Sequence, residues 1–170
     1  MTHAFISDMS TAYIGIGSNI GDRESNVLRA VKMMEAEGIR PVRLSSLIET
    51  EPWGVTDQPP YINAAAEVET RLQPMELLLA LRDIQKRMGR FFDATRWGPR
   101  VIDLDILFYD DLTIKESGLS IPHPLIAERA FVLDPLNEIA PDLVHPQTGK
   151  TVAKMRDELR AADRPDSNIP

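Results

Sequence analysis

The segment RWGPRVIDLDILF, residues 96–108, places two aspartates in the middle of an otherwise apolar stretch. Most residues from Val101 to Phe108 are good strand formers, so the stretch is predicted to be a buried or half-buried strand. Because side chains alternate along a strand, Asp103 and Asp105 share one face, about 6.6 Å apart along the chain. Two carboxylates this close in partly dry surroundings repel each other, so a cation is expected to face them.

The aspartate pair has two interpretations. In the first, the carboxylates bind Mg²⁺, which prefers oxygen ligands and is often completed by substrate phosphates. In the second, the strand face is solvated or the acids pair with protein arginines, and a bare D-x-D string alone favours this interpretation. Arg96, Arg100 and Trp97 shift the balance, because guanidinium groups suit phosphate oxygens and an aromatic face can stack on a base. Carboxylates that bind a metal ion, together with arginines that bind phosphate, are typical of a site for phosphoryl transfer.

Two further short motifs carry polar groups suited to a ligand. In YIN, Tyr61 and Asn63 share a strand face and offer a flat ring beside an amide, which suits a planar heterocycle. The alternative is a tyrosine that packs at the start of a strand. In IPHP, His123 lies between two prolines in a stiff extended segment, where it either donates to a phosphate or hydrogen-bonds its own loop. Both alternatives stay open.

The composition is that of an ordinary globular protein, with 170 residues, 43% of them hydrophobic and 26% charged. A net charge of −7 argues against a nucleic-acid partner. Residues 82–100 nevertheless hold a local excess of arginine and lysine, which suits a small anionic ligand or is balanced by salt bridges. No cysteine is present, which excludes disulfides and thiolate metal sites. Without a signal-peptide pattern or a long apolar run, a cytoplasmic chain that contacts no membrane is expected.

The elements that must position these residues alternate along the chain. Strand patterns cover 12–17, 42–48, 62–72 and 101–108, and helical patterns cover 27–34 and 74–89. The order β-α-β-β-α-β predicts an α+β fold, a ferredoxin-like sandwich with a mainly antiparallel sheet. After Asp110 a loop-rich segment with short helices is expected, ending in a helix near 151–160. A single domain over 1–170 is expected, with flexible ends at 1–10 and 161–170, acting as a monomer.

Two glycine-containing motifs resemble nucleotide-binding loops without matching them. GIGSNIG, residues 15–21, lies between a strand and a helix as a dinucleotide fingerprint would, but Ile20 occupies the place of the third glycine. TGKT, residues 148–151, has Val144 where a phosphate loop needs its first glycine, and no strand leads into it. The first is interpreted as a tight turn and the second is rejected, so any nucleotide must be held without either cradle.

Five strings occur together in one order: AYIGIGSNIGDR, ETEPWG, DQPPYIN, RWGPRVIDLDIL and IPHPLIAERAFVLDPLNEIAP. Of these, RWGPR-x-x-D-x-D-I is close to diagnostic. With these strings the chain resembles the 6-hydroxymethyl-7,8-dihydropterin pyrophosphokinases, folate-pathway enzymes that move a pyrophosphoryl group from ATP to a pterin alcohol. The resemblance implies that the hydroxyl attacks the β-phosphorus and that AMP leaves.

The resemblance also implies a role for each matching residue. Asp103 and Asp105 would bind two Mg²⁺ ions that bridge the ATP phosphates and the pterin hydroxyl, and Arg90 and Arg100 would be the catalytic arginines. The pterin would contact Thr50, Glu51, Pro52, Trp53, Tyr61, Asn63 and Phe131. ATP would contact Gln85, Arg96, Trp97, Arg100, Ile106, Ser120, His123 and Arg129. The loops 51–60 and 90–100 would close over the bound substrates.

Three positions depart from the family's pattern. Phe92 stands where many members carry a second arginine, which puts one phosphate contact in doubt. Ile48 replaces a tyrosine and Trp53 a smaller apolar residue, and both changes concern the mouth of the pterin pocket.

A second hypothesis, from another class, is a non-catalytic ferredoxin-like module that senses a small ligand and uses its acids and arginines as an internal salt-bridge network. Mg²⁺-dependent conversion of ATP separates the two hypotheses.

Overall fold

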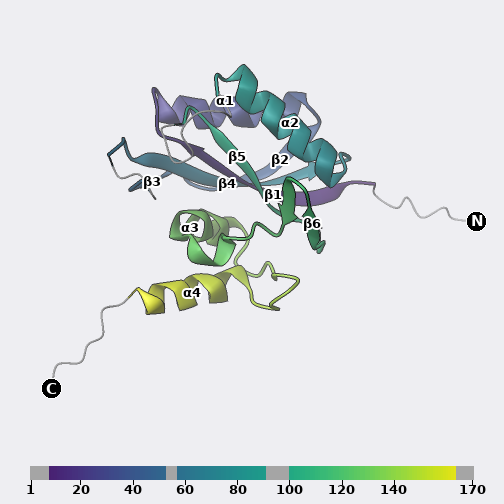
Figure 1. Cartoon of the computed structure of the whole chain (residues 1–170), viewed down its shortest axis with the longest axis vertical. Coiled ribbons are helices and arrows are strands. Elements are labelled where there is room, and N and C mark those ends of the chain that lie inside the picture. Colours follow the sequence, from purple (N-terminus) through teal and green to yellow (C-terminus); the bar gives the residue numbers. More distant parts are fainter. Residues whose placement is uncertain (1–7, 53–56, 91–99, 164–170) are drawn as a thin grey trace, which may run out of the picture.

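The computed structural model describes residues 8–52, 57–90 and 100–163, which form a central sheet with helices on both of its faces (Figure 1). The strands are β1 (Ser10–Ser18), β2 (Ile39–Leu44), β3 (Ile48–Thr50), β4 (Tyr61–Thr70), β5 (Asp103–Tyr109), β6 (Ile114–Glu116) and β7 (Leu119–Ile121). The helices are α1 (Arg23–Ala36), α2 (Pro74–Arg87), α3 (Ala130–Ile139) and α4 (Val152–Ala162), with a 3₁₀ turn at Ile126–Glu128.

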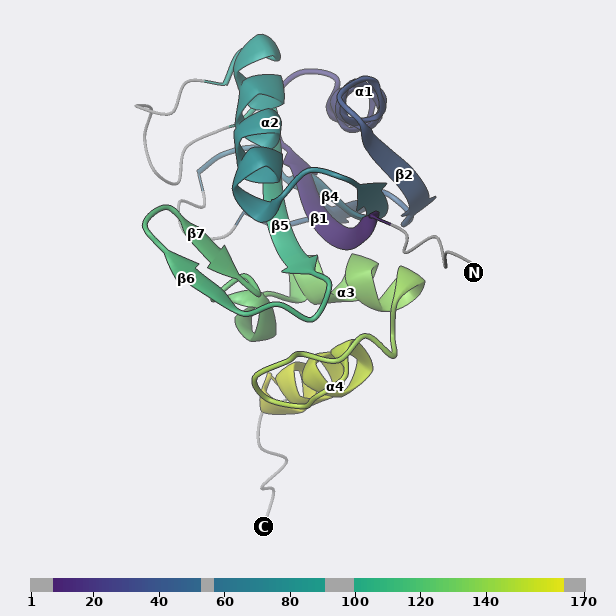
Figure 2. The same ribbon diagram turned by 90° about the vertical axis from the view of Figure 1, so that its right-hand side faces the viewer.

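The central sheet has the strand order β2-β4-β1-β5, with β3 paired to β4 as well, and each of these pairs is antiparallel. The predicted α+β, ferredoxin-like sandwich is therefore confirmed. The helix expected near 151–160 is α4. Strands β6 and β7 form a separate hairpin that the sequence did not predict, and it lies beside β5 and the adjacent end of α2 (Figure 2).

The single strand predicted at 42–48 is wrong, because this segment holds the end of β2 and the start of β3. The interruption is at Ser45, whose backbone N–H donates to the Ala65 carbonyl at 2.9 Å. The Ser45 hydroxyl accepts from the Ala65 N–H at 2.9 Å, so a side chain replaces a strand partner here. Glu138 of α3 then accepts from both the backbone and the hydroxyl of Ser46, which docks the break onto α3.

Helices α1 and α2 cover one face of the sheet, whereas α3 and α4 stack below the other (Figures 1 and 2). The larger apolar core fills the space between the sheet and the first helix pair, and its strand members include Ile14, Ile16, Leu104 and Ile106. A smaller core joins the opposite face to α3 and α4, around Ala65, Leu107, Phe108, Leu133, Leu136, Val152 and Met155. The two faces of the same strands thus have different helical covers.

The described ends of the chain are β1 and α4. Strand β1 begins at Ser10 and α4 extends to Ala162, so each element reaches slightly into a terminal segment for which flexibility was expected. Within residues 8–52, 57–90 and 100–163, no helix has the length and apolar character needed to cross a bilayer.

Candidate functional site

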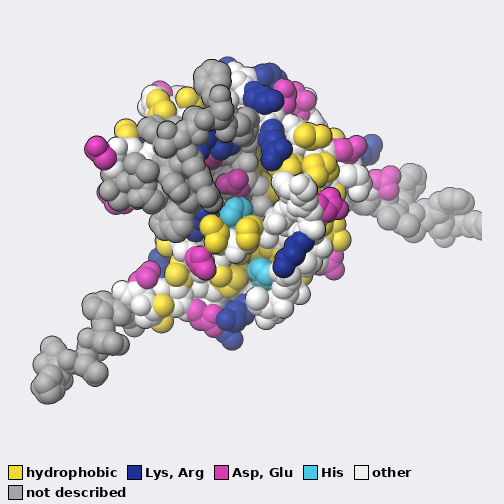
Figure 3. All heavy atoms as spheres, viewed as in Figure 1, with side chains coloured by type: hydrophobic (Ala, Val, Ile, Leu, Met, Phe, Trp, Pro, Cys, Tyr) yellow, Lys and Arg dark blue, Asp and Glu magenta, His cyan; other side chains and the backbone are white. Residues whose placement is uncertain are grey.

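A cavity of about 220 Å³ opens on the sheet face that carries α3, beside the first residues of β5. Side chains from β1, β4, β5 and the start of α3 line it, together with Arg90 and Arg100. Figure 3 shows acidic, basic and histidine side chains gathered near the middle of this face of the molecule. The first cavity therefore brings together charged groups that lie far apart in the sequence.

The floor of the first cavity is made by glycines of β1. Gly17 lies between Asn63 of β4 and Asp103 of β5, and Gly15 pairs with Asp105 in the neighbouring row. A Cβ atom at position 17 would come within 2.9 Å of the Asn63 Oδ1 atom. Glycine inside a strand commonly marks the close approach of a ligand or another backbone. The GIG segment, predicted as the end of a strand that leads into a tight turn, is the floor of the site.

Asp103 and Asp105 share one face of β5, as predicted, and both line the first cavity. Leu104 between them is buried in the core on the other side. Asp103 Oδ1 lies 3.1 Å from Arg90 Nη2. Burial raises the pKa of Asp103 from 3.8 to about 6. The positive charge of Arg90 lowers this pKa, whereas the negative charge of Asp105 raises it further. One acid is thus paired with a protein arginine, yet both carboxylates still face the cavity.

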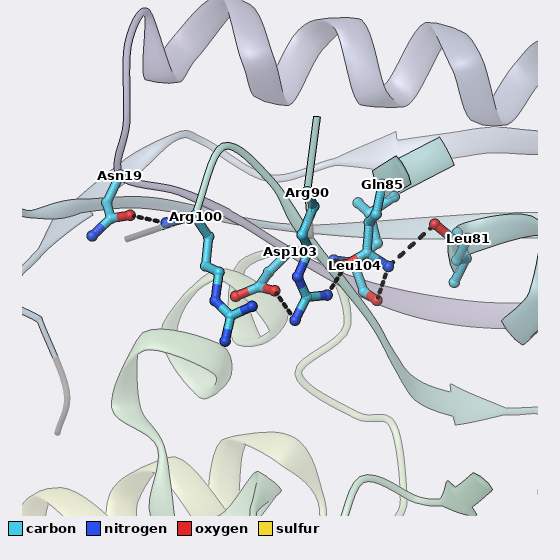
Figure 4. A network of polar contacts seen from close by, with 7 residues as sticks. All are labelled: Asn19, Leu81, Gln85, Arg90, Arg100, Asp103 and Leu104. Atoms are coloured by element: carbon cyan, nitrogen blue, oxygen red, sulfur yellow. Dashed lines mark hydrogen bonds and ion pairs between the residues drawn. The ribbon is translucent and has the colours of Figure 1, made fainter. Parts of the chain in front are cut away.

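Arg90 and Arg100 reach the first cavity from opposite ends of the 91–99 segment, which lies outside the described residues. Helix α2 ends before Gly89, which has a φ of +95°, and the Arg90 N–H then donates to the Gln85 carbonyl at 3.0 Å. The backbone of Arg100 is held by Asn19, whose Oδ1 accepts from the Arg100 N–H at 2.7 Å (Figure 4). Burial lowers the pKa of Arg90, with Asp103 opposing the shift.

Arg129 is the third cation of the first cavity. It precedes α3 and lies over the Phe131 ring, with 5.6 Å between the guanidinium carbon and the ring centroid. Burial lowers the pKa of Arg129, and Asp105 is the main opposing charge. An arginine stacked on an aromatic ring presents its edge in a defined direction, which suits the recognition of phosphate oxygens.

The opposite wall of the first cavity carries neutral polar groups. Asn63 Nδ2 donates to Thr50 Oγ1 at 2.5 Å, and Thr50 is also the strand partner of Tyr61. Burial raises the pKa of Tyr61, and the negative charge of Asp103 adds to the shift. Tyr61 therefore lines the cavity as a neutral ring. Phe131 completes this wall. A flat, hydrogen-bonding heterocycle suits this arrangement of rings and amide.

The turn after β1 braces the segment that leads into Tyr61. Asn19 Nδ2 donates to Gln58 Oε1 at 2.8 Å and to the Pro59 carbonyl at 3.2 Å. Arg23 donates to the Pro60 carbonyl at 2.7 Å and forms an ion pair with Glu49. These contacts join positions 26 to 40 residues apart, so no local pattern in the sequence indicates them.

A second cavity, of about 410 Å³, lies between α2, β5 and the β6–β7 hairpin. Arg90, Asp105 and His123 line both cavities, so the two meet at these residues. His123 Nδ1 accepts from the Leu125 N–H at 3.2 Å, which leaves Nε2 as the protonated nitrogen of the neutral ring. Burial lowers the pKa of His123, with Asp105 opposing the shift. Both alternatives for His123 are compatible with this geometry, because the loop contact uses only one nitrogen.

The structure gathers most of the predicted site residues. The first cavity is lined by Thr50, Glu51, Tyr61, Asn63, Arg90, Arg100, Asp103, Asp105, His123, Arg129 and Phe131. The second cavity is lined by Gln85, Arg90, Asp105, Ile106, Ser120 and His123, and also by Arg82 and Glu116, which the sequence did not single out. Pro52 is not among the described residues that line either cavity. The predictions for Trp53, Arg96 and Trp97, and the departure at Phe92, fall outside the described residues.

Comparison with known proteins gives concordant results. Residues 13–141 match the family model of the 7,8-dihydro-6-hydroxymethylpterin-pyrophosphokinases. The chain is 47% identical over 137 residues to the 2-amino-4-hydroxy-6-hydroxymethyldihydropteridine pyrophosphokinase of Methylorubrum extorquens, covering 80% of this chain and 86% of that one. It is 39% identical over 150 residues to the Aquifex aeolicus protein of the same name, covering 88% of this chain and 92% of that one.

Longer proteins also contain a region similar to this chain. It is 43% identical over 152 residues to the folic acid synthesis protein fol1 of Pneumocystis carinii, covering 89% of this chain but spanning only 20% of that protein. The crystal structure of wild-type Plasmodium falciparum HPPK-DHPS superposes with a TM-score of 0.75 at 15% identity, covering 95% of this chain and 46% of that one. At this identity the superposition shows a shared fold.

Proposed function

The chain belongs to the 7,8-dihydro-6-hydroxymethylpterin-pyrophosphokinase family, and we propose that its two adjoining cavities are where pyrophosphate passes from ATP to 6-hydroxymethyl-7,8-dihydropterin in folate synthesis. The products are AMP and the pterin diphosphate. One observation carries the placement: a slot lined by aromatic rings and an amide meets a cluster of three arginines and two carboxylates in a single cavity.

The pterin belongs on the neutral wall of the first cavity. Tyr61 and Phe131 supply ring faces, and the Asn63 amide supplies a donor and an acceptor for the edge of the heterocycle. Asn63 Oδ1 faces the space above Gly17, where a side chain would otherwise intrude. The hydroxymethyl group then points along the floor toward Asp103.

ATP belongs in the second cavity, with its phosphates at the boundary with the first. Ile106 and Ser120 offer an apolar and a polar contact beside the hairpin, while Arg90 and His123 lie where the two cavities meet. In this placement the pterin oxygen forms a bond to the β-phosphorus, the bond from that phosphorus to the bridging α-oxygen breaks, and AMP leaves. Phosphoryl transfer of this kind depends mainly on positioning and on neutralising charge.

Mg²⁺, expected as two ions, fits the acids of the first cavity. Asp103 and Asp105 present two carboxylates to one space, and the raised pKa of Asp103 shows that Arg90 does not fully offset its burial. Among the described residues no group of three or more His, Cys, Asp or Glu could form a closed metal site. A two-carboxylate set suits Mg²⁺, which retains water and is completed by substrate phosphates. When bound, the metal would withdraw charge from the phosphate oxygens.

The arginines hold positive charge at fixed places around the transferring group. Arg90 is oriented through its contact with Asp103, the backbone of Arg100 is fixed by Asn19, and Arg129 lies over the Phe131 ring. Oriented charges in a partly buried site stabilise developing negative charge without having to reorganise during the reaction. Arg90 and Arg100 are therefore proposed as catalytic residues and Arg129 as a contact of the ATP phosphates.

Phosphorus NMR of the protein with ATP, Mg²⁺ and 6-hydroxymethyl-7,8-dihydropterin tests the proposal directly. We expect AMP and a pterin diphosphate to appear together, and the conversion to stop when Mg²⁺ is chelated. Formation of ADP would instead indicate transfer of a single phosphoryl group. No conversion at all would favour the hypothesis of a ligand-sensing module, in which the same charges act as a salt-bridge network.

A further inference from the structure

We infer that Gln85 is a positioning residue that fixes the Arg90 guanidinium against Asp103, instead of contacting ATP as the family resemblance implies. Arg90 matters in this way only if the site transfers pyrophosphate, so the inference rests on the proposed function. Four contacts on three chain segments support it, and all involve the side-chain amide of Gln85 (Figure 4).

Gln85 lies on the buried face of α2. Its neighbours on that face, Leu77, Leu81 and Ile84, are apolar and fully buried, and Gln85 itself is only 2% exposed. A polar amide in such a place costs free energy unless its hydrogen-bonding groups are satisfied. An apolar residue would serve the packing of this helix face as well, so the amide needs another explanation.

The amide uses its full hydrogen-bonding capacity within the protein. Nε2 donates to the Leu81 carbonyl at 3.1 Å and to the Leu104 carbonyl at 3.4 Å. Oε1 accepts from the Leu104 N–H at 3.3 Å and from the Arg90 Nη1 atom. A carboxamide offers two donors and two acceptor positions, so all four are engaged. No direct hydrogen bond to ATP remains available without breaking one of these.

The partners of the amide explain its use. Leu104 lies between the two acids on β5, and both of its backbone polar groups bond to Gln85. The same amide oxygen holds one end of the Arg90 guanidinium, while the other end reaches Asp103 Oδ1 at 3.1 Å. Gln85 therefore links the arginine to the strand that carries the carboxylates. We call this set of contacts the Gln85 clamp.

The Gln85 clamp has a direct consequence for catalysis. An arginine side chain has several rotatable bonds, and ordering it during the reaction costs conformational entropy. A guanidinium that is held before substrates arrive avoids this cost and keeps its charge aimed at the transferring group. Loss of the clamp should therefore lower turnover more than it weakens the binding of either substrate.

Five variants test the inference by steady-state kinetics of AMP formation with Mg²⁺. We expect Gln85→Leu to lower kcat about tenfold, as loss of a supporting contact commonly does, with KM for ATP and pterin changed less than about twofold. Gln85→Glu keeps the acceptor for Arg90 and should recover most of kcat. Ile84→Val, a matched core change on the same helix face, should lower the melting temperature without lowering kcat.

The fourth variant is Arg90→Lys alone, and the fifth combines it with Gln85→Leu. If Gln85 acts through Arg90, its loss adds less than about a twofold decrease in kcat in the lysine background, because the two effects share one cause. Fully multiplicative losses would overturn the inference. So would a raised KM for ATP with unchanged kcat in Gln85→Leu, since that result identifies a direct contact with the nucleotide.

A measurement without substrate separates this inference from the proposed function. In the ¹⁵N-labelled protein, the Arg90 Nε–H signal, assigned by its loss in Arg90→Lys, should show increased mobility in Gln85→Leu and not in Ile84→Val. An unchanged signal overturns the clamp whatever the activity. A parent protein that forms no AMP, but whose Arg90 signal responds as expected, overturns the proposed function and leaves the physical clamp standing.

Discussion

The two faces of the central sheet differ although the same strands build both. On one face Ile16 and Leu104 are sealed beneath α1 and α2, with 2% and 3% of their surfaces exposed. On the other, Gly17 and Asp103 are adjacent strand partners that line an open cavity. A strand alternates its side chains, so each segment contributes a core residue and a site residue in turn. Stability and chemistry are therefore encoded in alternate positions of one short stretch.

The open face results from incomplete cover by the second helix pair. Helices α3 and α4 pack against the sheet around Ala65, Leu107 and Phe108. Gly15 pairs with Ala65 at the edge of this core, and Gly15 and Gly17 both line the cavity. The difference between the faces shows that the first cavity lies beside the start of α3, where charged residues line the sheet in place of the apolar residues that would otherwise pack there.

The largest expected effect comes from breaking the polar face at Asp105. Asp105→Ala should lower the rate of AMP formation by at least about 100-fold, because it removes a proposed metal ligand and a charge at the boundary of the cavities. The fold should persist, since the change also relieves like-charge repulsion with Asp103. Circular dichroism and steady-state kinetics on the same sample measure both quantities. Near-normal turnover would contradict the metal assignment.

Leu104→Ala is the matched change on the sealed face, one residue away. It should cost about 2–5 kcal/mol in the free energy of unfolding, as large-to-small changes in cores do. Asp105→Ala should cost far less in the same denaturant titration. If Leu104→Ala and Asp105→Ala lose a similar free energy of unfolding, the proposed difference between a stabilising face and a functional face is wrong.

A smaller effect is expected from narrowing the floor with Gly17→Ala. The new Cβ would meet Asn63 Oδ1 at 2.9 Å and displace the amide from the pterin wall. We expect KM for the pterin to rise about tenfold, with KM for ATP little changed. Gly15→Ala is the control, because its Cβ meets the flexible Leu107 side chain, whose nearest methyl is at 3.2 Å. Equal losses in both variants would contradict a specific role for the space above Gly17.

The smallest effect concerns stability and pH in the absence of Mg²⁺. The pKa of Asp103 is about 6 in the folded protein and is taken as its ordinary 3.8 when unfolded, so the folded state binds this proton more tightly. Stability contributed by Asp103 is therefore lost as pH rises from about 4 to about 6. Asp103→Asn, which mimics the protonated acid, should match the parent near pH 4 and melt at a higher temperature at pH 7. A difference that shrinks with rising pH would show that Arg90 outweighs burial.

The sequence predicted the features that depend on local periodicity. The alternation in DLDIL placed both acids on one face, and YIN placed Tyr61 and Asn63 together, as the structure confirms for the first cavity. It did not indicate the glycine floor, because GIGSNIG was compared with a dinucleotide-binding fingerprint. The role of Gly15 and Gly17 depends on their neighbours on β4 and β5. Contacts between distant segments leave no local pattern.

The contacts of Gln85 and Ser45 were not predicted from the sequence, for the same physical reason. The family resemblance implies an ATP contact for Gln85, and only the packing of α2 on β5 brings its amide to the backbone of Leu104. Ser45 sits inside a strand-like pattern, and the interruption depends on a hydroxyl that bonds to Ala65 twenty residues away. A polar side chain can hydrogen-bond to a ligand or to several protein groups, so the sequence alone does not identify its partner.

The pairing of β5 with β1 has one more consequence, for how this segment can evolve. Asp103 and Asp105 face the site only because their spacing from Arg100 and their register on β1 are kept. Deleting a single residue between Arg100 and Asp103 would turn both acids into the apolar layer and push Leu104 toward solvent. A substitution alters one side chain, whereas an insertion or deletion moves every side chain of the strand to the opposite face of the sheet. In a deletion scan, this stretch should therefore tolerate no gap, even at positions where substitutions are accepted.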